Sequence, residues 1–334
     1  MIKIEFCKNG YDPQIDYIKG LCILFVVLTH CMSREELGRI LFPYWGDTAV
    51  PIFLIIQVFH YYKNGINLRM PNIIKLCKRI ITPFVMMTAT MFAIQYIIYY
   101  NITGGLFSPS LYWDKRGPGS YYILIYLEFA FIIPFFAPLL HKISRKWILI
   151  IFIIISQLFE YICCIIKCPD YIYRITFFRY FFLIYIGYIL ATKGLVVTRY
   201  TICGIIISIF FLYLFNYTNI NMEPIYYTSL SNWKCCHWIC YIYIAHFFLC
   251  FLKYTHKKLS KYKKIQEFFE SIGRYSYDIY LFQIIYYATI SIYVNKALSS
   301  VEYYPIQHIL YIVFSTIICL LPAILNLRNV LLGK

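Results

Sequence analysis

The sequence predicts an all-α membrane protein with about ten transmembrane helices and both termini in the cytoplasm. Of its 334 residues, 61% are hydrophobic and 14% are charged, whereas soluble domains are about 45–50% apolar and about 25% charged. The apolar residues gather in runs of about 20, the length at which a helix crosses a bilayer. Lys and Arg concentrate in alternate loops, as in membrane proteins of fixed orientation. Together these observations exclude a soluble fold.

The apolar runs predict where the helices lie. Ten segments are long enough, at roughly 16–34, 47–63, 80–100, 120–140, 146–166, 175–193, 200–217, 234–252, 277–295 and 306–327. The first two are the least hydrophobic. Some contain Pro, which membrane helices tolerate better than soluble helices do. We expect a single integral-membrane domain over residues 1–334, with no appended soluble domain.

The basic residues predict the orientation of these helices. Most Lys and Arg lie at the two termini and in the loops that follow the second, fourth, sixth and eighth segments. The positive-inside rule places these regions in the cytoplasm. The same rule accounts for the net charge of +16, so we expect no nucleic-acid partner.

The cysteines do not predict a disulfide framework or a metal site. There are 13, an odd number, and most lie inside apolar runs, as small buried residues with reduced thiols do. Cys235, Cys236, His237 and Cys240 lie close together, but their spacing is not that of a structural zinc site. We therefore expect no metal.

One stripe of ionisable residues stands out in the first apolar segment. Lys19 and His30 lie on nearly the same face of a helix, roughly 16 Å apart along its axis. Asp16 is an i,i+3 neighbour of Lys19 on that face. Ionisable residues inside a membrane helix usually face a cavity and serve function. The stripe therefore predicts a polar cavity along this helix.

Six segments, in order along the chain, carry a resemblance to a known family. The first is the Asp16, Lys19-Gly20 and His30 pattern, a basic residue followed ten residues later by His. The others are AVPIFLIIQVF (49–59), KRIITPF (78–84), GPGSYYILIYLEF (117–129), FRYFFLIYIGY (178–188) and IGRYSYDIYLFQ (272–283). The chain resembles the integral-membrane acyltransferase 3 family. It departs from the family pattern at Asp12, where Arg is frequent, at Gln57, where Ser is frequent, and at Gln283, where His is frequent.

The resemblance implies an enzyme of the bacterial plasma membrane. Members transfer an acyl group, usually acetyl from acetyl-CoA, to hydroxyls of cell-surface or exported carbohydrates. It implies acetyl-CoA as co-substrate, a polysaccharide or lipid-linked glycan as acceptor, and no permanently bound cofactor. His30 suits a general base for the hydroxyl, or a nucleophile that carries the acyl group. Asp16 is the second candidate in the catalytic stripe, and we expect it to orient Lys19.

Other charged residues are candidates for binding the substrates. Lys19, Arg79 and Arg274 lie at the expected cytoplasmic helix ends, where they would hold the phosphates of acyl-CoA. The alternative is that Lys19 extends to the headgroups and the arginines only set orientation. Arg179 and Glu128 lie in the outer halves of their segments, where they would pair with each other or face the acceptor.

Several patterns leave alternatives open. Residues 64–79 and 257–273 are expected to form amphipathic helices on the inner leaflet, either as anchors or as part of the donor site. His60, His141, His256 and His308 lie near predicted helix ends and are interpreted as interfacial. A glycan transporter without acyl chemistry, or a relative that has lost catalysis, also fits a cationic and aromatic-rich membrane chain.

Overall fold

The all-α fold class is confirmed. The computed structural model describes residues 3–7, 10–64, 70–103, 118–142, 145–218, 220, 227, 236–301 and 303–325. Within these ranges the only sheet is a two-residue antiparallel pair, β1 (Lys3–Ile4) with β2 (Leu195–Val196), in which Lys3 pairs with Val196. All the other regular elements there are helices.

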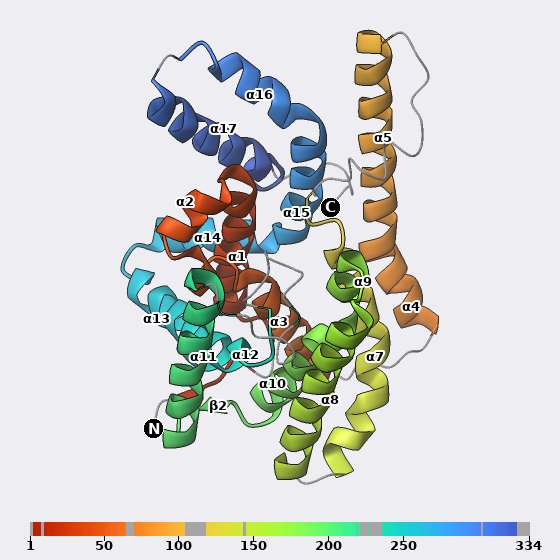
Figure 1. Ribbon diagram of the computed structural model, residues 1–334, viewed down its shortest axis with the longest axis vertical. Helices are drawn as coiled ribbons and strands as arrows, with labels where there is room; N and C mark the ends of the chain where they lie inside the picture. The colour runs from red at the N-terminus through yellow and green to blue at the C-terminus, as the bar shows by residue number, and fades with distance from the viewer. Residues whose placement is uncertain are drawn as a thin grey trace.

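Helix α1 (Pro13–Cys31) is the central element. Its N-terminus is set by sequence, because the Asp12 carboxylate caps the Gln14 N–H at 3.0 Å and Pro13 occupies the first turn, where its missing N–H costs nothing. In Figure 1 α1 lies in the middle of the molecule, and it packs against α3 (Ala49–Asn64), α14 (Lys263–Arg274) and α17 (Tyr304–Ile324). The ionisable stripe is therefore surrounded by protein.

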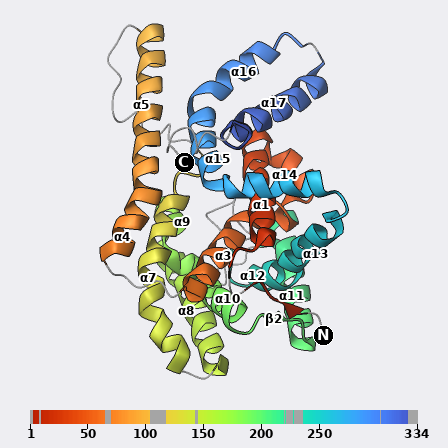
Figure 2. The same ribbon diagram turned by 180° about the vertical axis from the view of Figure 1, so that it is seen from behind.

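The remaining helices surround this centre. Helices α5 (Thr82–Thr103) and α11 (Arg199–Tyr217) stand on opposite flanks of the molecule (Figures 1 and 2). Helix α10 (Phe181–Thr192) packs between α3 and α8 (Arg145–Ile166). The other helices are α2 (Arg34–Arg39), η1 (Phe42–Tyr44), α4 (Met70–Leu76), η2 (Cys77–Ile81), α5 (Thr82–Thr103), α7 (Tyr122–Lys142), α8 (Arg145–Ile166), α9 (Asp170–Ile175), η3 (Phe177–Tyr180), α10 (Phe181–Thr192), α11 (Arg199–Tyr217), α12 (Cys240–Tyr243), η4 (Ile244–Phe248), α13 (Leu249–Leu259), α15 (Ser276–Ile285), η5 (Tyr286–Ile290) and α16 (Ser291–Leu298).

Seven helices in the described part of the chain are long and apolar enough to cross a membrane. They are Pro13–Cys31, Phe42–Asn64, Pro71–Ile98, Tyr122–Leu140, Lys146–Ile166, Arg199–Tyr217 and Tyr304–Ile324. The predicted segment 175–193 corresponds to a shorter apolar helix, Phe177–Thr192. The segment 277–295 is helical, and the segment 234–252 is helical from Cys240 onward, but neither is among the seven. The start of the former, and the end of 306–327, lie outside the described residues. The count of ten and the orientation stay predictions.

In the part of the chain that the structure describes, three helices contain a π-helical stretch, at η2, η4 and η5. Such stretches insert one residue into an α-helix and often occur at functional sites. Arg79 lies within η2, between the short helix α4 and the long helix α5. The predicted amphipathic region 64–79 is thus helical from Met70 onward, and its first part lies outside the described residues.

Two glycines allow α14 to lie directly on α1, as Figure 2 shows. A β-carbon on Gly20 would collide with the backbone carbonyl of Phe269, and one on Gly273 would collide with the backbone carbonyl of Asp16. The backbones of the two helices therefore touch at this crossing. The predicted region 257–273 is divided between the end of α13 and α14, which begins at Lys263. Helix α14 packs on α1, while Ile265 and Phe268 stay exposed.

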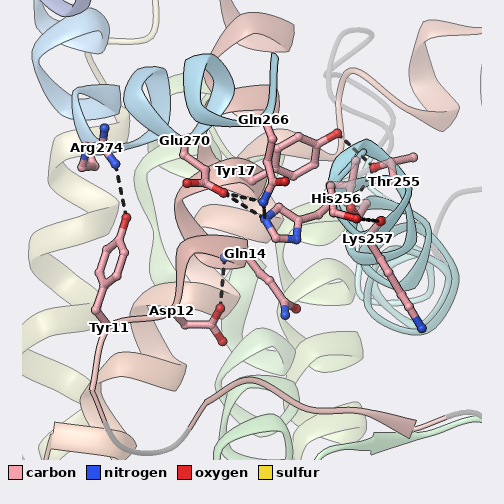
Figure 3. A network of polar contacts seen from close by, with 12 residues as sticks. Tyr11, Asp12, Gln14, Tyr17, Thr255, His256, Lys257, Gln266, Glu270 and Arg274 are labelled. Carbon is pink, nitrogen blue, oxygen red and sulfur yellow. Dashed lines mark hydrogen bonds and ion pairs between the residues drawn. The ribbon is translucent and has the colours of Figure 1, made fainter. Parts of the chain in front are cut away.

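A buried polar network fixes α13 and α14 beside α1 (Figure 3). Nε2 of His256 lies 3.0 Å from Oε1 of Glu270, and Gln266 donates to the same carboxylate oxygen at 2.8 Å. The Tyr17 hydroxyl donates to Thr255 at 3.2 Å. The interfacial interpretation of His256 is wrong, because this side chain is buried and bound to a carboxylate from the next helix.

Candidate functional site

A cavity of about 230 Å³ follows the ionisable stripe of α1. Its walls come from α1, α3, η2, the turn before α7, and α15. Four of the residues predicted from sequence line it, namely Lys19, His30, Arg79 and Arg274. The structure thus brings together side chains that are up to 255 positions apart in the chain.

The three cations gather at one end of this cavity. Nζ of Lys19 lies 2.5 Å from a carboxylate oxygen of Asp16, which itself is buried. Arg274 is the last residue of α14 and donates to the Tyr11 hydroxyl at 3.4 Å (Figure 3). Asp16 is roughly 21 Å along the helix axis from His30, so the geometry suits orientation of Lys19 and not contact with the imidazole.

His30 lies at the other end, beside an unusual turn. Gly119, just before α7, has φ +85°, a left-handed conformation that favours glycine. The Tyr280 hydroxyl donates to the Gly119 carbonyl at 2.8 Å and ties this turn to α15. The point where a β-carbon on Gly119 would lie is 3.9 Å from Nε2 of His30. The Tyr287 ring packs edge-on against the imidazole, and its hydroxyl donates to the Val27 carbonyl at 3.1 Å.

His30 also borders a second cavity, of about 350 Å³, beyond the C-terminal end of α1. Its other polar and aromatic walls come from α16 and α17, and they include Asn295, Tyr304, Gln307 and Tyr311. His308 also lines it and lies 3.0 Å from a carboxylate oxygen of Glu36 on α2. His30 therefore borders both a cationic cavity, named the inner cavity below, and an aromatic and amide-lined one, named the outer cavity.

Arg179 and Glu128 line neither cavity within the described residues. The Arg179 guanidinium lies 4.6 Å from the centre of the Tyr173 ring, and the Tyr173 hydroxyl donates to Glu160 at 2.7 Å. A carboxylate oxygen of Glu128 accepts from the backbone N–H of Phe177. Both predicted residues thus lie around η3, away from His30.

Some cavity residues were not predicted from sequence. Asp47, Gln57 and His60 line the first cavity, and Gln57 donates to the Tyr126 carbonyl at 2.8 Å. Gln57 and His60 are three residues apart on one face of an apolar helix, the same signal that singled out the stripe on α1. We interpreted His60 as interfacial and overlooked this signal. We also interpreted His308 as interfacial, and its contact with Glu36 was not predicted. The His141 side chain lies outside the description.

Comparison with known proteins identifies the family. No curated protein and no solved structure matches the chain. The model of the acyltransferase 3 family, described as an acyltransferase domain, matches residues 12–325. This range includes both cavities and every residue of the ionisable stripe. The protein is therefore a multi-pass membrane acyltransferase that belongs to the acyltransferase 3 family.

Proposed function

We propose that this acyltransferase moves an acetyl or other short acyl group from acyl-CoA to a hydroxyl of a cell-surface polysaccharide or its lipid-linked precursor. We place it in a bacterial plasma membrane, with the end that carries Lys19 in the cytoplasm. One observation carries the proposal: His30 borders two cavities of different chemistry. A transferase must bring a donor and an acceptor to one catalytic group, and this arrangement provides a separate approach for each.

The inner cavity suits the donor. Lys19, Arg79 and Arg274 at its entrance provide three positive charges for the phosphates of CoA. The axial distance from Lys19 to His30 is roughly 16 Å. An extended pantetheine arm would bridge this distance and bring the thioester to the imidazole. The acyl-CoA pool is cytoplasmic, which agrees with the orientation predicted from the basic loops.

The outer cavity suits the acceptor. Tyr304 and Tyr311 offer flat apolar surfaces for sugar rings, and Asn295 and Gln307 offer amide donors and acceptors for hydroxyl groups. A hydroxyl entering here would reach His30 from the side opposite the donor. Arg179 and Glu128 lie elsewhere, so we assign them to the packing around η3 and not to direct contact with the sugar.

His30 performs the proton transfer in this scheme. As the acceptor oxygen attacks the thioester carbon, the imidazole takes the hydroxyl proton; when the C–S bond breaks, the imidazolium returns that proton to the sulfur of CoA. The products are the ester and free CoA. In a covalent route the imidazole attacks first and carries the acyl group to the hydroxyl. In both routes His30 is in contact with the acyl carbon or the attacking oxygen.

The test is CoA release from acetyl-CoA by purified protein in lipid nanodiscs, with a bacterial lipid-linked glycan extract as acceptor. We expect His30→Ala to lower turnover by about 10²- to 10⁴-fold. The matched control is His246→Ala, a histidine within η4 that lines neither cavity, and it should leave turnover unchanged.

Two results would contradict the proposal. Equal release by wild type and His30→Ala would remove His30 from the chemistry. Absence of both turnover and acetyl-CoA binding in the wild type, with an extract shown to contain acceptor, would favour a transporter that has no acyl chemistry.

A further inference from the structure

Gln283 is a fully buried amide for which the described residues provide no partner. Its exposed fraction is 0%, and neither its amide nitrogen nor its amide oxygen has a hydrogen-bond partner in the described part of the chain. Most buried polar groups in proteins are hydrogen-bonded, because leaving one unpaired costs free energy. Such an exception requires an explanation. One explanation is that the amide forms its hydrogen bond only with the substrate during the reaction.

The position of Gln283 is next to the reacting nitrogen of His30. The point where a β-carbon on Gly119 would lie is 3.8 Å from Nε2 of Gln283 and 3.9 Å from Nε2 of His30. The nearest other atom is in the Tyr280 ring, at 3.6 Å. The two nitrogens therefore both lie within 4 Å of one point beside Gly119, a residue of the first cavity's wall.

The neighbouring hydroxyl donors are already engaged. Tyr280 lies three residues before Gln283 on the same face of α15, and its hydroxyl donates to the Gly119 carbonyl. The Tyr287 hydroxyl donates to the Val27 carbonyl. The Gln283 amide, in contrast, has no hydrogen-bond partner among the described residues.

We propose that Gln283 is a catalytic residue that stabilises the oxyanion during acyl transfer. Its Nε2–H donates to the thioester carbonyl oxygen while the acceptor hydroxyl attacks the carbonyl carbon and His30 takes the hydroxyl proton. When the C–S bond breaks, the carbonyl re-forms, the Gln283 hydrogen bond weakens, and the proton leaves with CoA. This role rests on the function proposed above.

The physics favours a neutral donor at this position. Negative charge develops on the carbonyl oxygen only in the transition state, so a fixed amide dipole aimed at that oxygen stabilises the transition state more than the substrate. Such a dipole is most effective where water is excluded, as it is around a side chain of 0% exposure. A cation in this place would have to be desolvated inside the membrane, whereas an amide carries no net charge.

The experiment compares Gln283→Met and Gln283→Glu with wild type, in nanodiscs, with the same acetyl-CoA and glycan extract. Met preserves the volume and removes both unpaired polar atoms; Glu preserves the shape but replaces the donor with an acceptor. We expect both substitutions to lower kcat by about 10²- to 10³-fold and to change acetyl-CoA affinity less than about twofold. Gln283→Met should also unfold at a temperature no lower than wild type, because it removes an unsatisfied buried group.

The matched control is Gln95→Met. Gln95 is also a buried glutamine, but its amide donates to the Ala288 carbonyl at 3.3 Å. We expect Gln95→Met to lower the unfolding temperature and to leave kcat unchanged.

Two results would overturn this assignment alone. Retention of kcat in Gln283→Met would show that no donor is needed there. A parallel fall in kcat, acetyl-CoA affinity and unfolding temperature would show a structural role. If wild type turns over but the Gln283 variants do so equally well, only this inference fails. If wild type and His30→Ala release CoA at the same rate, the proposed function fails first and this inference with it.

Discussion

The two innermost membrane helices differ from those at the periphery. Within the span windows, 50% of Pro13–Cys31 and 61% of Phe42–Asn64 is buried in protein, against 22–28% of the other five candidate spans. The inner pair is also the less hydrophobic one. Lipid requires apolar side chains, whereas helices surrounded by protein can carry the polar groups that a reaction needs. In this chain low hydrophobicity therefore indicates a position at the centre, and the cavity follows these same two helices.

The largest expected effect is at the crossing of α1 and α14. Gly273→Ala places a methyl group on the Asp16 carbonyl, and we expect it to lower the free energy of unfolding by at least about 4 kcal/mol. Gly38→Ala is the control, since nothing lies within 4 Å of its added carbon. Thermal unfolding in detergent measures both. If the two variants were equally stable, α1 and α14 would be able to move apart without loss of folding free energy, which would contradict this prediction.

A matched pair of isoleucines tests the difference between the inner and outer helices directly. Ile52 on α3 is 0% exposed and Ile154 on α8 is 58% exposed. Ile52→Ala leaves a cavity that neighbouring side chains cannot fill, and it should lower the free energy of unfolding by about 2–4 kcal/mol. The side chain at position 154 faces lipid both before and after the substitution. Ile154→Ala should therefore lower the free energy of unfolding by less than about 1 kcal/mol. Unfolding in mixed micelles would compare them, and similar losses would contradict the division into inner and outer helices.

Removal of a positive charge should affect donor binding only where that charge lines the first cavity. Lys19→Gln removes one cation from the cavity entrance and should weaken acetyl-CoA binding by about 1.5–3 kcal/mol. Lys146→Gln, at the exposed start of α8, should leave binding unchanged. Isothermal titration with acetyl-CoA tests both, and an equal loss in both variants would point to a general effect of membrane charge.

The smallest expected effect is a pH dependence where α2 meets α17. Burial opposes ionisation of Glu36, but hydrogen bonds from Ser33 and the neighbouring His308 outweigh it and lower the pKa of Glu36 from its ordinary 4.5. The carboxylate therefore stabilises the folded state above about pH 4.5, and this contribution is lost as the pH falls through the lower folded pKa.

Hydrogen exchange in α2 between pH 6 and pH 3 would measure this loss. Glu36→Gln should abolish the pH dependence. The carboxylate of Glu35 pairs with Arg39 on an exposed surface, so Glu35→Gln should keep the pH dependence. Persistence of the pH dependence in Glu36→Gln would assign it to another group.

Much of the site could be predicted from the sequence, because helix period and charge place it. Lys19 and His30 share a face of one helix, and Arg79 and Arg274 lie where the basic loops meet their helices. The residues that were missed depend on tertiary contacts. The turn at Gly119 and the proximity of Gln283 to His30 follow from how α15 packs against the start of α7, which no local pattern reports. Gln283 differs from the usual family residue, and only the structure shows its unsatisfied amide beside the imidazole.

The backbone contact between Gly20 and α14 has a consequence for how the enzyme responds to its bilayer. Each glycine of the crossing is next to a cation of the cavity entrance, since Lys19 precedes Gly20 and Arg274 follows Gly273. Backbone atoms have no rotamers, so the positions from which these two side chains extend are fixed relative to each other. Hydrophobic mismatch tilts lipid-exposed helices, but it cannot change this spacing without separating α1 from α14. The affinity for the donor should therefore be insensitive to lipid chain length, even in membranes where the outer helices change their tilt.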